Sequence, residues 1–149
     1  MSSVDRISFL TFLISALHIA CVPGSDKRED QSVKFQQYFV AGEALYQKNC
    51  ANCHQVNGTG LGKVYPPLEK SDFMEKNFEE VVCLLKFGKK GEIWVNGSMY
   101  NQEMKGIPEL SNLEMAEIIT YVYNSWGNSR GLVEVSEVDN LLLYCSEPK

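Results

Sequence analysis

Apolar side chains recur at helical spacing in several stretches of the chain, and residues that favour turns separate these stretches. The first such stretch covers residues 39–52. Another begins at Asn77, a helix-capping residue followed three positions later by Glu80, and its apolar face ends at Gly88. The pattern therefore predicts one helix over 39–52 and another between Asn77 and Gly88.

The best-delimited helix is predicted closer to the C-terminus. Ser111 and Glu114 have the spacing of a capping box, and Gly127 stands where the residue after a helix C-terminus belongs. The apolar residues between them form a broad stripe that must pack against another element. A short final helix is predicted over 135–145, with Ser136 as its cap. We therefore expect a mostly helical fold.

Two stretches lack helical spacing. Between residues 57 and 70, several glycines and a pair of prolines require irregular backbone, and we expect a loop. Residues 93–100 contain Asn96-Gly97, which is typical of the tight turn of a β-hairpin. A hairpin of this size is not stable by itself, so the rest of the domain must support it.

The sequence Cys50-Ala51-Asn52-Cys53-His54 is a C-x-x-C-H motif at the end of the first predicted helix, and this motif is typical of c-type haem attachment. Two thiols at this spacing can each add to one vinyl group of a haem, while the adjacent imidazole binds the iron. The motif therefore predicts a redox protein with one covalently bound haem c.

Two other uses of a C-x-x-C pair fit the chain less well. In a thioredoxin-like dithiol the pair follows a strand, whereas the residues before Cys50 predict a helix. A structural zinc ion takes four sulfur or nitrogen ligands. Apart from the motif, the exported chain offers only two isolated cysteines, Cys83 and Cys145, for that purpose.

The N-terminus resembles a bacterial export signal. Arg6 precedes an apolar stretch over residues 7–20, which is too short for a transmembrane helix. We expect residues 1–20 to be removed on export. The protein would then lie in the periplasm, or at the extracytoplasmic face of a bacterial membrane.

The residues before Cys21 resemble a lipoprotein cleavage site, although His18 replaces the apolar residue expected three positions before the cysteine. On this interpretation Cys21 carries a lipid and contacts the membrane. The polar residues 21–37 then form a disordered tether to a domain over 38–146. A secretory signal that is cut nearby, leaving Cys21 free or removing it, is the alternative.

Composition limits the remaining choices. A chain of 149 residues with 44% hydrophobic residues suits one small globular domain, to whose core a haem adds apolar surface. The chain has 14 Lys and Arg residues and 19 Asp and Glu residues, and the basic residues form no stripe. Nucleic acid is therefore not an expected partner. In an oxidising compartment Cys83 and Cys145 can form a disulfide, and two separate buried thiols are an equally good interpretation.

An electron carrier needs a second axial ligand to the iron. His18 lies in the signal, so a methionine is the expected ligand. Met74 is expected to open a helix and Met115 lies in the first turn of another, where packing explains both. Met99 and Met104 lie in the irregular stretch before the last long helix, and their position alone does not separate them.

Several ordered motifs resemble class I cytochromes c, in particular the cytochrome c domains found alone or fused to copper nitrite reductases and other respiratory enzymes. Besides the attachment motif, they comprise residues 65–72, 95–104 and 119–128, so the resemblance covers roughly 40–128. It implies the all-α class I cytochrome c fold. In that fold, three to five helices surround one covalently bound haem, with a short hairpin before the axial methionine loop.

The resemblance also implies roles for individual residues. The family's Asn-Gly-x-x-Tyr-Asn-x-x-Met run ends in the iron-binding methionine, here Met104, and Leu68 matches an apolar haem contact. Pro66 matches the proline whose carbonyl accepts a hydrogen bond from the iron-binding histidine. Gly42 matches a glycine that lets the first helix cross the last one closely. Lys105 follows Met104 where the family commonly has proline, which implies a looser loop.

The function that the resemblance implies is electron transfer without catalysis. With His54 and Met104 as ligands, the protein would shuttle single electrons between respiratory redox proteins, such as an oxidase or a nitrite reductase. A fixed electron-entry subunit of a larger oxidase or reductase complex is the alternative. A haem peroxidase or gas sensor fits less well, because no distal His or Arg group is visible.

Overall fold

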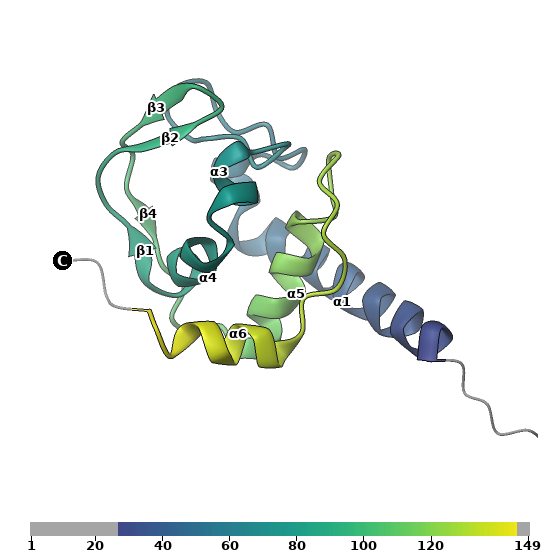
Figure 1. Ribbon diagram of the computed structural model, residues 1–149. Helices are drawn as coiled ribbons and strands as arrows, with labels where there is room; N and C mark the ends of the chain where they lie inside the picture. The colour runs from purple at the N-terminus through teal and green to yellow at the C-terminus, as the bar shows by residue number, and fades with distance from the viewer. Residues whose placement is uncertain (1–26, 146–149) are drawn as a thin grey trace, which may run out of the picture.

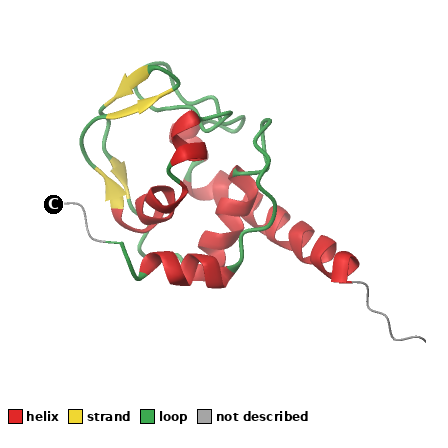
Figure 2. Ribbon diagram, in the orientation of Figure 1, coloured by secondary structure: helices red, strands yellow, loops and turns green. Residues whose placement is uncertain are grey.

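The computed structural model describes residues 27–145. The export signal and Cys21 of the sequence analysis lie outside these residues. Within the described part of the chain, helices predominate and two small antiparallel sheets lie at one side (Figures 1 and 2). The helices are α1 (Lys27–Asn49), α2 (Ala51–His54), α3 (Asp72–Lys76), α4 (Phe78–Phe87), α5 (Asn112–Val122) and α6 (Val135–Leu142). The strands are β1 (Gly88–Lys89), β2 (Ile93–Val95), β3 (Ser98–Tyr100) and β4 (Met104–Lys105).

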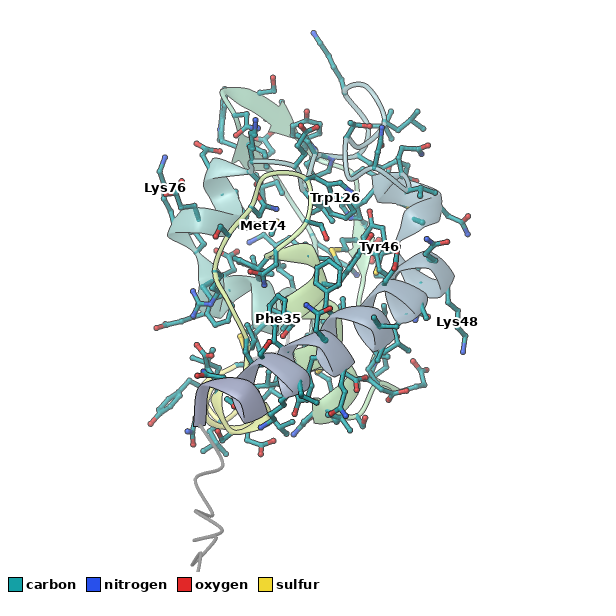
Figure 3. The ribbon with its side chains drawn as sticks, turned by 90° about the vertical axis from the view of Figure 1, so that its right-hand side faces the viewer. Phe35, Tyr46, Lys48, Met74, Lys76 and Trp126 are labelled. Carbon is teal, nitrogen blue, oxygen red and sulfur yellow. A yellow bond between two sulfur atoms is a disulfide. The ribbon has the colours of Figure 1, made fainter. Side chains whose placement is uncertain are left out.

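The core lies where α1 crosses α5. A Cβ atom at Gly42 would overlap the carbonyl oxygen of Glu117 in α5, so only glycine allows this approach. Tyr46 is fully buried one turn later, and its ring centroid lies 5.4 Å from that of Tyr121 and 5.1 Å from that of Trp126. Figure 3 shows Tyr46 pointing from α1 towards Trp126. The close crossing expected at Gly42 is confirmed.

The predicted hairpin is confirmed, and a second strand pair accompanies it. Strands β2 and β3 pair around Asn96 and Gly97, whose φ angles of 50° and 73° are those of a tight hairpin turn. Strand β1, directly after α4, pairs with β4, so that Gly88 lies opposite Lys105. The mostly helical fold expected from the sequence is therefore present.

Helix α5 has the predicted beginning but ends earlier than expected. Ser111 and Glu114 form the complete capping box, whereas the helix ends at Val122 and Gly127 is not its C′ residue. The reason is Asn124, whose side-chain amide donates to the carbonyl oxygens of Thr120 and Gly131 and so bends the chain away from the helix axis.

Asn77 takes the predicted N-cap position of α4, but its side-chain amide donates to the carbonyl oxygen of Phe73 in α3 and forms no capping hydrogen bond. The cap predicted for the last helix is wrong. At α6 the capping position is occupied by Glu134 and not by Ser136, and the Glu134 side chain forms no capping hydrogen bond. Both side chains belong to short connections whose geometry the sequence spacing does not fix.

The expected disordered tether over 21–37 is wrong for its described part, because α1 begins at Lys27. Lys34 forms an ion pair with Glu134, and the ring of Phe35 stacks on that of Phe39, with 5.8 Å between centroids. The ion pair joins the polar first half of α1 to the segment before α6, and Phe39 continues the contact to α5, with its ring centroid 5.1 Å from that of Tyr121. None of the helices in the described residues is long and apolar enough to cross a membrane.

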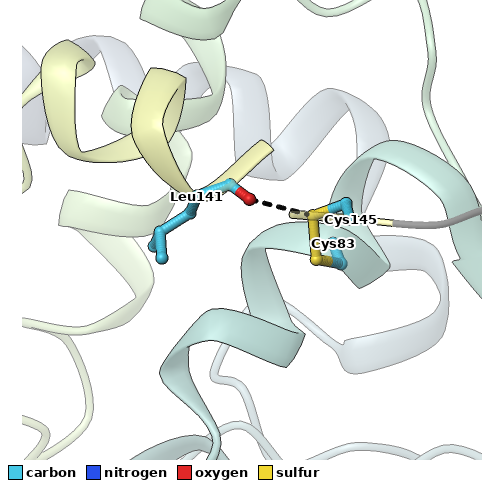
Figure 4. Close-up of a disulfide and its surroundings, with 3 residues drawn as sticks. All are labelled: Cys83, Leu141 and Cys145. Carbon is cyan, nitrogen blue, oxygen red and sulfur yellow. Dashed lines mark hydrogen bonds between the residues drawn. A yellow bond between two sulfur atoms is a disulfide. The ribbon is translucent and has the colours of Figure 1, made fainter. Parts of the chain in front are cut away.

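Cys83 in α4 and Cys145 after α6 form a disulfide (Figure 4). Their Cα atoms lie 5.5 Å apart, within the range of native disulfides. The carbonyl oxygen of Leu141 lies 3.5 Å from Cys145 Sγ, but a disulfide sulfur has no hydrogen to donate. Because α6 packs against both α4 and α5, the bond fastens the C-terminal helix to the outside of the core.

Candidate functional site

The C-x-x-C-H motif continues the helical path of α1. The amide of Cys50 donates to the carbonyl oxygen of Tyr46, and the amide of His54 donates to that of Cys50. Residues four apart on a helix lie on the same face, so Cys50 and His54 both line one internal cavity. Cys53 is half-buried, outside the lining, and a hydrogen bond with its side chain raises the pKa of Tyr65.

His54 is buried and oriented by the loop that follows it. Its Nδ1 lies 3.0 Å from the carbonyl oxygen of Pro66, the contact that the family resemblance implied. A carbonyl only accepts, so Nδ1 carries the hydrogen and Nε2 is the nitrogen with a free lone pair. Burial lowers the pKa of His54, although the Pro66 hydrogen bond opposes this. The neutral imidazole, which is the metal-binding form, therefore predominates at neutral pH.

The glycines of this loop allow it to return to the motif. The Gly58 carbonyl oxygen accepts a hydrogen bond of 2.7 Å from the amide of Leu68, which brings Leu68 to the cavity wall. Gly60 has a φ of 69°, and a Cβ atom there would overlap the backbone of Pro66. The irregular stretch predicted over 57–70 thus positions Pro66 beside His54.

The cavity has a volume of about 100 Å³. Its walls come from α1, α3, α4, α5, the hairpin and β4, and are almost entirely apolar. The lining includes Cys50, His54, Pro66, Leu68 and Met104 from the predicted set, together with Tyr46, Ser71, Phe73, Met74, Val81, Leu84, Leu85, Ile93, Val95, Ile118, Ile119, Val122 and Tyr123.

The structure distinguishes Met99 from Met104, the two candidate iron ligands that sequence position alone did not separate. Met104, in β4, lines the cavity. Met99 lies in β3 opposite Trp94, is 44% exposed, and is absent from the cavity wall. Met115 is fully buried in the core and does not line the cavity, whereas Met74 is a second thioether in the wall. The sequence pattern predicts a packing role for Met74 and does not indicate its place beside the cavity.

Two of the lining residues carry no sequence signal. The hydroxyl of Tyr123 donates to the carbonyl oxygen of Met74 at 2.9 Å, which ties the end of α5 to α3 across the cavity wall. Burial raises the pKa of Tyr123. Ser71 caps α3 and also faces the cavity. These roles depend on tertiary approach, which the spacing of residues along the chain does not reveal.

The two alternative uses of the cysteine pair conflict with this geometry. A helix, and not a strand, precedes Cys50, and burial together with the neighbouring Cys53 raises the Cys50 pKa to about 12, unlike a reactive dithiol. Cys83 and Cys145 bond to each other and so cannot complete a zinc site. In the described residues, no group of three or more His, Cys, Asp or Glu side chains has the arrangement of a metal site.

The donor set fits a haem. One end of the cavity offers the thiol of Cys50 and the neutral imidazole of His54, and the thiol of Cys53 lies next to His54 in the chain, outside the lining. Met104 offers a thioether, and the apolar walls suit a flat macrocycle.

The cytochrome c family model matches residues 39–126. The chain belongs to the cytochrome c family. This confirms the family expected from the sequence motifs. Members of this family carry covalent haem c and transfer electrons, and the Cys50 and Cys53 pair is consistent with that attachment.

Curated cytochromes c of two kinds are similar to the chain. Cytochrome c-552 of Thermus thermophilus is 31% identical over 93 residues, which covers 60% of this chain and 70% of that protein. The cytochrome c subunit of a quinone alcohol dehydrogenase of Gluconobacter oxydans is 30% identical over 105 residues, covering 68% of this chain. The present chain spans only 22% of that subunit's length.

Proposed function

We propose that this cytochrome c carries single electrons between redox proteins, with a haem attached at Cys50 and Cys53 and its iron between His54 Nε2 and Met104 Sδ. The observation that carries the proposal is the presence of His54 and Met104 in the wall of one apolar cavity, with Met99 outside it. When bound, the haem supplies the one-electron couple of its iron. The remaining roles, which are holding the haem and positioning its ligands, belong to the side chains of the protein.

The ligands and the walls favour the reduced state. The Pro66 carbonyl fixes the orientation of the His54 ring. Both proposed ligands are neutral. A thioether ligand favours ferrous iron, and apolar walls disfavour the additional positive charge of the ferric state. We therefore expect a comparatively high reduction potential.

The partners are proposed from the family and from the similar proteins. If the protein is a mobile carrier, a respiratory oxidase or a nitrite reductase would accept its electron. The alternative, a fixed electron-entry subunit, is supported by relatives that are themselves named as cytochrome c subunits of an enzyme. Co-purification in mild detergent separates the two, because a fixed subunit stays with its complex at stoichiometric amounts.

The proposed location is the extracytoplasmic face of a bacterial membrane, with a lipid on Cys21. The motif at Cys21 and the apolar residues before it support this proposal. Labelled fatty acid should be incorporated into the wild-type protein and not into Cys21→Ser. Equal labelling of both would contradict the anchor and leave electron transfer unaffected.

The methionine assignment is tested in holoprotein matured in a host that attaches haem. The oxidised wild-type protein should show the far-red sulfur-to-iron charge-transfer band, and Met104→Ala should lose it. Met99→Ala is the matched control, because this exposed methionine lies outside the cavity, and it should retain the band. Loss of the band in Met74→Leu, with retention in Met104→Ala, would assign the ligand to Met74 instead. An intact mass equal to the bare polypeptide would contradict the whole proposal.

A further inference from the structure

The segment that carries Met104 is held against the end of α4 without the proline that commonly follows this methionine in the family. Met104 lies opposite Lys89 in the ladder of β1 and β4. Three residues after Met104, the amide of Ile107 donates to the carbonyl oxygen of Leu85 in α4 at 2.9 Å. The segment is therefore anchored to α4 on both sides of Lys105.

The two backbones also approach very closely at this place. A Cβ atom at Gly106 would overlap the carbonyl oxygen of Lys86 and the amide of Gly88. A Cβ atom at Gly88 would in turn overlap the carbonyl oxygen of Met104. Glycine on both sides lets the end of α4 serve as a support on which the Met104 segment lies.

Lys86 adds two hydrogen bonds that cross this contact. Its half-buried side chain projects from the last turn of α4, and Nζ donates to the carbonyl oxygens of Pro108 at 2.8 Å and Leu110 at 3.0 Å. The neighbouring Lys89 pairs with a carboxylate, that of Glu80. Of these two lysines, Lys86 is therefore the one whose ammonium group binds the backbone after Met104.

We propose that Lys86 is a positioning residue for Met104: by holding the carbonyl oxygens of Pro108 and Leu110 it restricts the segment that a following proline would otherwise stiffen. This inference rests on the proposed ligation by Met104. A charged donor forms stronger hydrogen bonds to carbonyl oxygens than a neutral one does. The two bonds join residues 86 and 108–110, so they oppose any movement that lifts Met104 away from the cavity wall.

The proposal predicts a measurable opening equilibrium. Exogenous imidazole can take the place of the Met104 sulfur only in molecules whose segment has moved away, so its apparent affinity is proportional to the open fraction. Each lost hydrogen bond changes such an equilibrium by a factor of about 2 to 12. Lys86→Met should therefore bind imidazole roughly tenfold more tightly than the wild type in the oxidised holoprotein.

Three variants make the measurement specific. Lys86→Arg keeps the charge and the donors and should bind imidazole within about threefold of the wild type. Lys89→Met removes a positive charge from the same surface without touching the carbonyl oxygens, so its affinity should not change. Val138→Ala removes buried side-chain volume from α6, none of whose residues lines the cavity, and serves as the control for lower overall stability.

The outcomes separate this inference from the proposed function. Wild-type affinity in Lys86→Met, or an equal increase in Lys89→Met or Val138→Ala, overturns the role of Lys86. Absence of the charge-transfer band from the wild type, or its survival in Met104→Ala, overturns the ligand assignment itself. Where Lys86→Met yields no holoprotein, Lys86→Gln is titrated against the same controls, and the same criteria apply.

Discussion

Gly42 determines how closely α1 can approach α5. Its position in α1 leaves no room for a side chain, because the backbone of Glu117 occupies the place of a Cβ atom. Tyr46 and Tyr121 pack beside this contact. The aromatic contacts of the core therefore depend on the absence of a single methyl group.

We expect Gly42→Ala to lower the free energy of unfolding by about 2 kcal/mol. Inserting a methyl group into a packed contact costs about 1–3 kcal/mol, and the overlap of a Cβ atom with the Glu117 carbonyl oxygen places this site at the upper end. The gain in helix propensity of alanine over glycine, about 1 kcal/mol, offsets only part of this strain. Denaturant unfolding measures the change, and Gln47→Ala on the exposed face of the same helix is the control. A stability of Gly42→Ala equal to that of the wild type would show that the helices can separate at no cost.

The sequence identified the residues of the site better than their surroundings. The C-x-x-C-H motif is local, and one helical turn brings its two cysteines and His54 to their places. Met99 and Met104 could not be separated by position, because strand pairing decides which of them faces the cavity. Met74 and Tyr123 reach the cavity through a hydrogen bond between residues 49 positions apart, which no local pattern shows.

At the scale of elements, the first turn of α5 is fixed by its capping box. The amide and hydroxyl of Ser111 both donate to Glu114 Oε2 at 2.8 Å. These hydrogen bonds with the Ser111 backbone and side chain lower the pKa of Glu114. Since α5 forms one wall of the cavity, its beginning also influences the position of that wall.

The stability that Glu114 contributes should depend on pH. A carboxyl group whose pKa is lowered on folding stabilises the protein above its ordinary pKa of about 4.3, and this stabilisation is lost as the pH falls through the folded pKa. Glu114→Gln should therefore be less stable than wild type at pH 7, and the difference should shrink below about pH 4. Urea unfolding across this range measures it, with the exposed Glu92→Gln as control. A difference that persists unchanged at pH 3 would contradict the role of the carboxylate.

Helix boundaries were predictable where a local hydrogen bond decides them and not elsewhere. The capping box at Ser111 is such a case. The end of α5 depends on an Asn124 bond to Gly131, and the polar first half of α1 contacts the rest of the domain through Lys34 and Glu134, which lie 100 residues apart. The polar composition of residues 27–37 therefore suggested a tether where the fold provides partners for a helix.

At the scale of the molecule, α6 and the disulfide extend the matched domain. Both Cys145 and α6 lie after residue 126, where the family match ends. Helix α6 packs on the outer side of α4 and α5, and its own residue Val138 is fully buried. The sequence left the pairing of Cys83 and Cys145 open, because only the folded positions of α4 and α6 bring the two residues together.

Replacing both Cys83 and Cys145 by alanine should lower the free energy of unfolding by about 2–4 kcal/mol, since their disulfide closes a long loop in the unfolded chain. The two cysteines lie 62 positions apart. Each single variant should lose nearly as much as the double variant, because either one breaks the bond. Additive losses would show that the thiols contribute through packing and not through the bond. The charge-transfer band should remain in all three, because the cavity walls do not include Cys83 or Cys145.

The disulfide also determines how a pulling force would pass through the protein. Tension applied between residue 27 and residue 145 follows the backbone to Cys83 and then crosses the sulfur bridge directly to Cys145. The intervening chain, which includes Met104, stays slack while α1 and the motif are loaded. The loaded path therefore includes His54 and leaves out Met104.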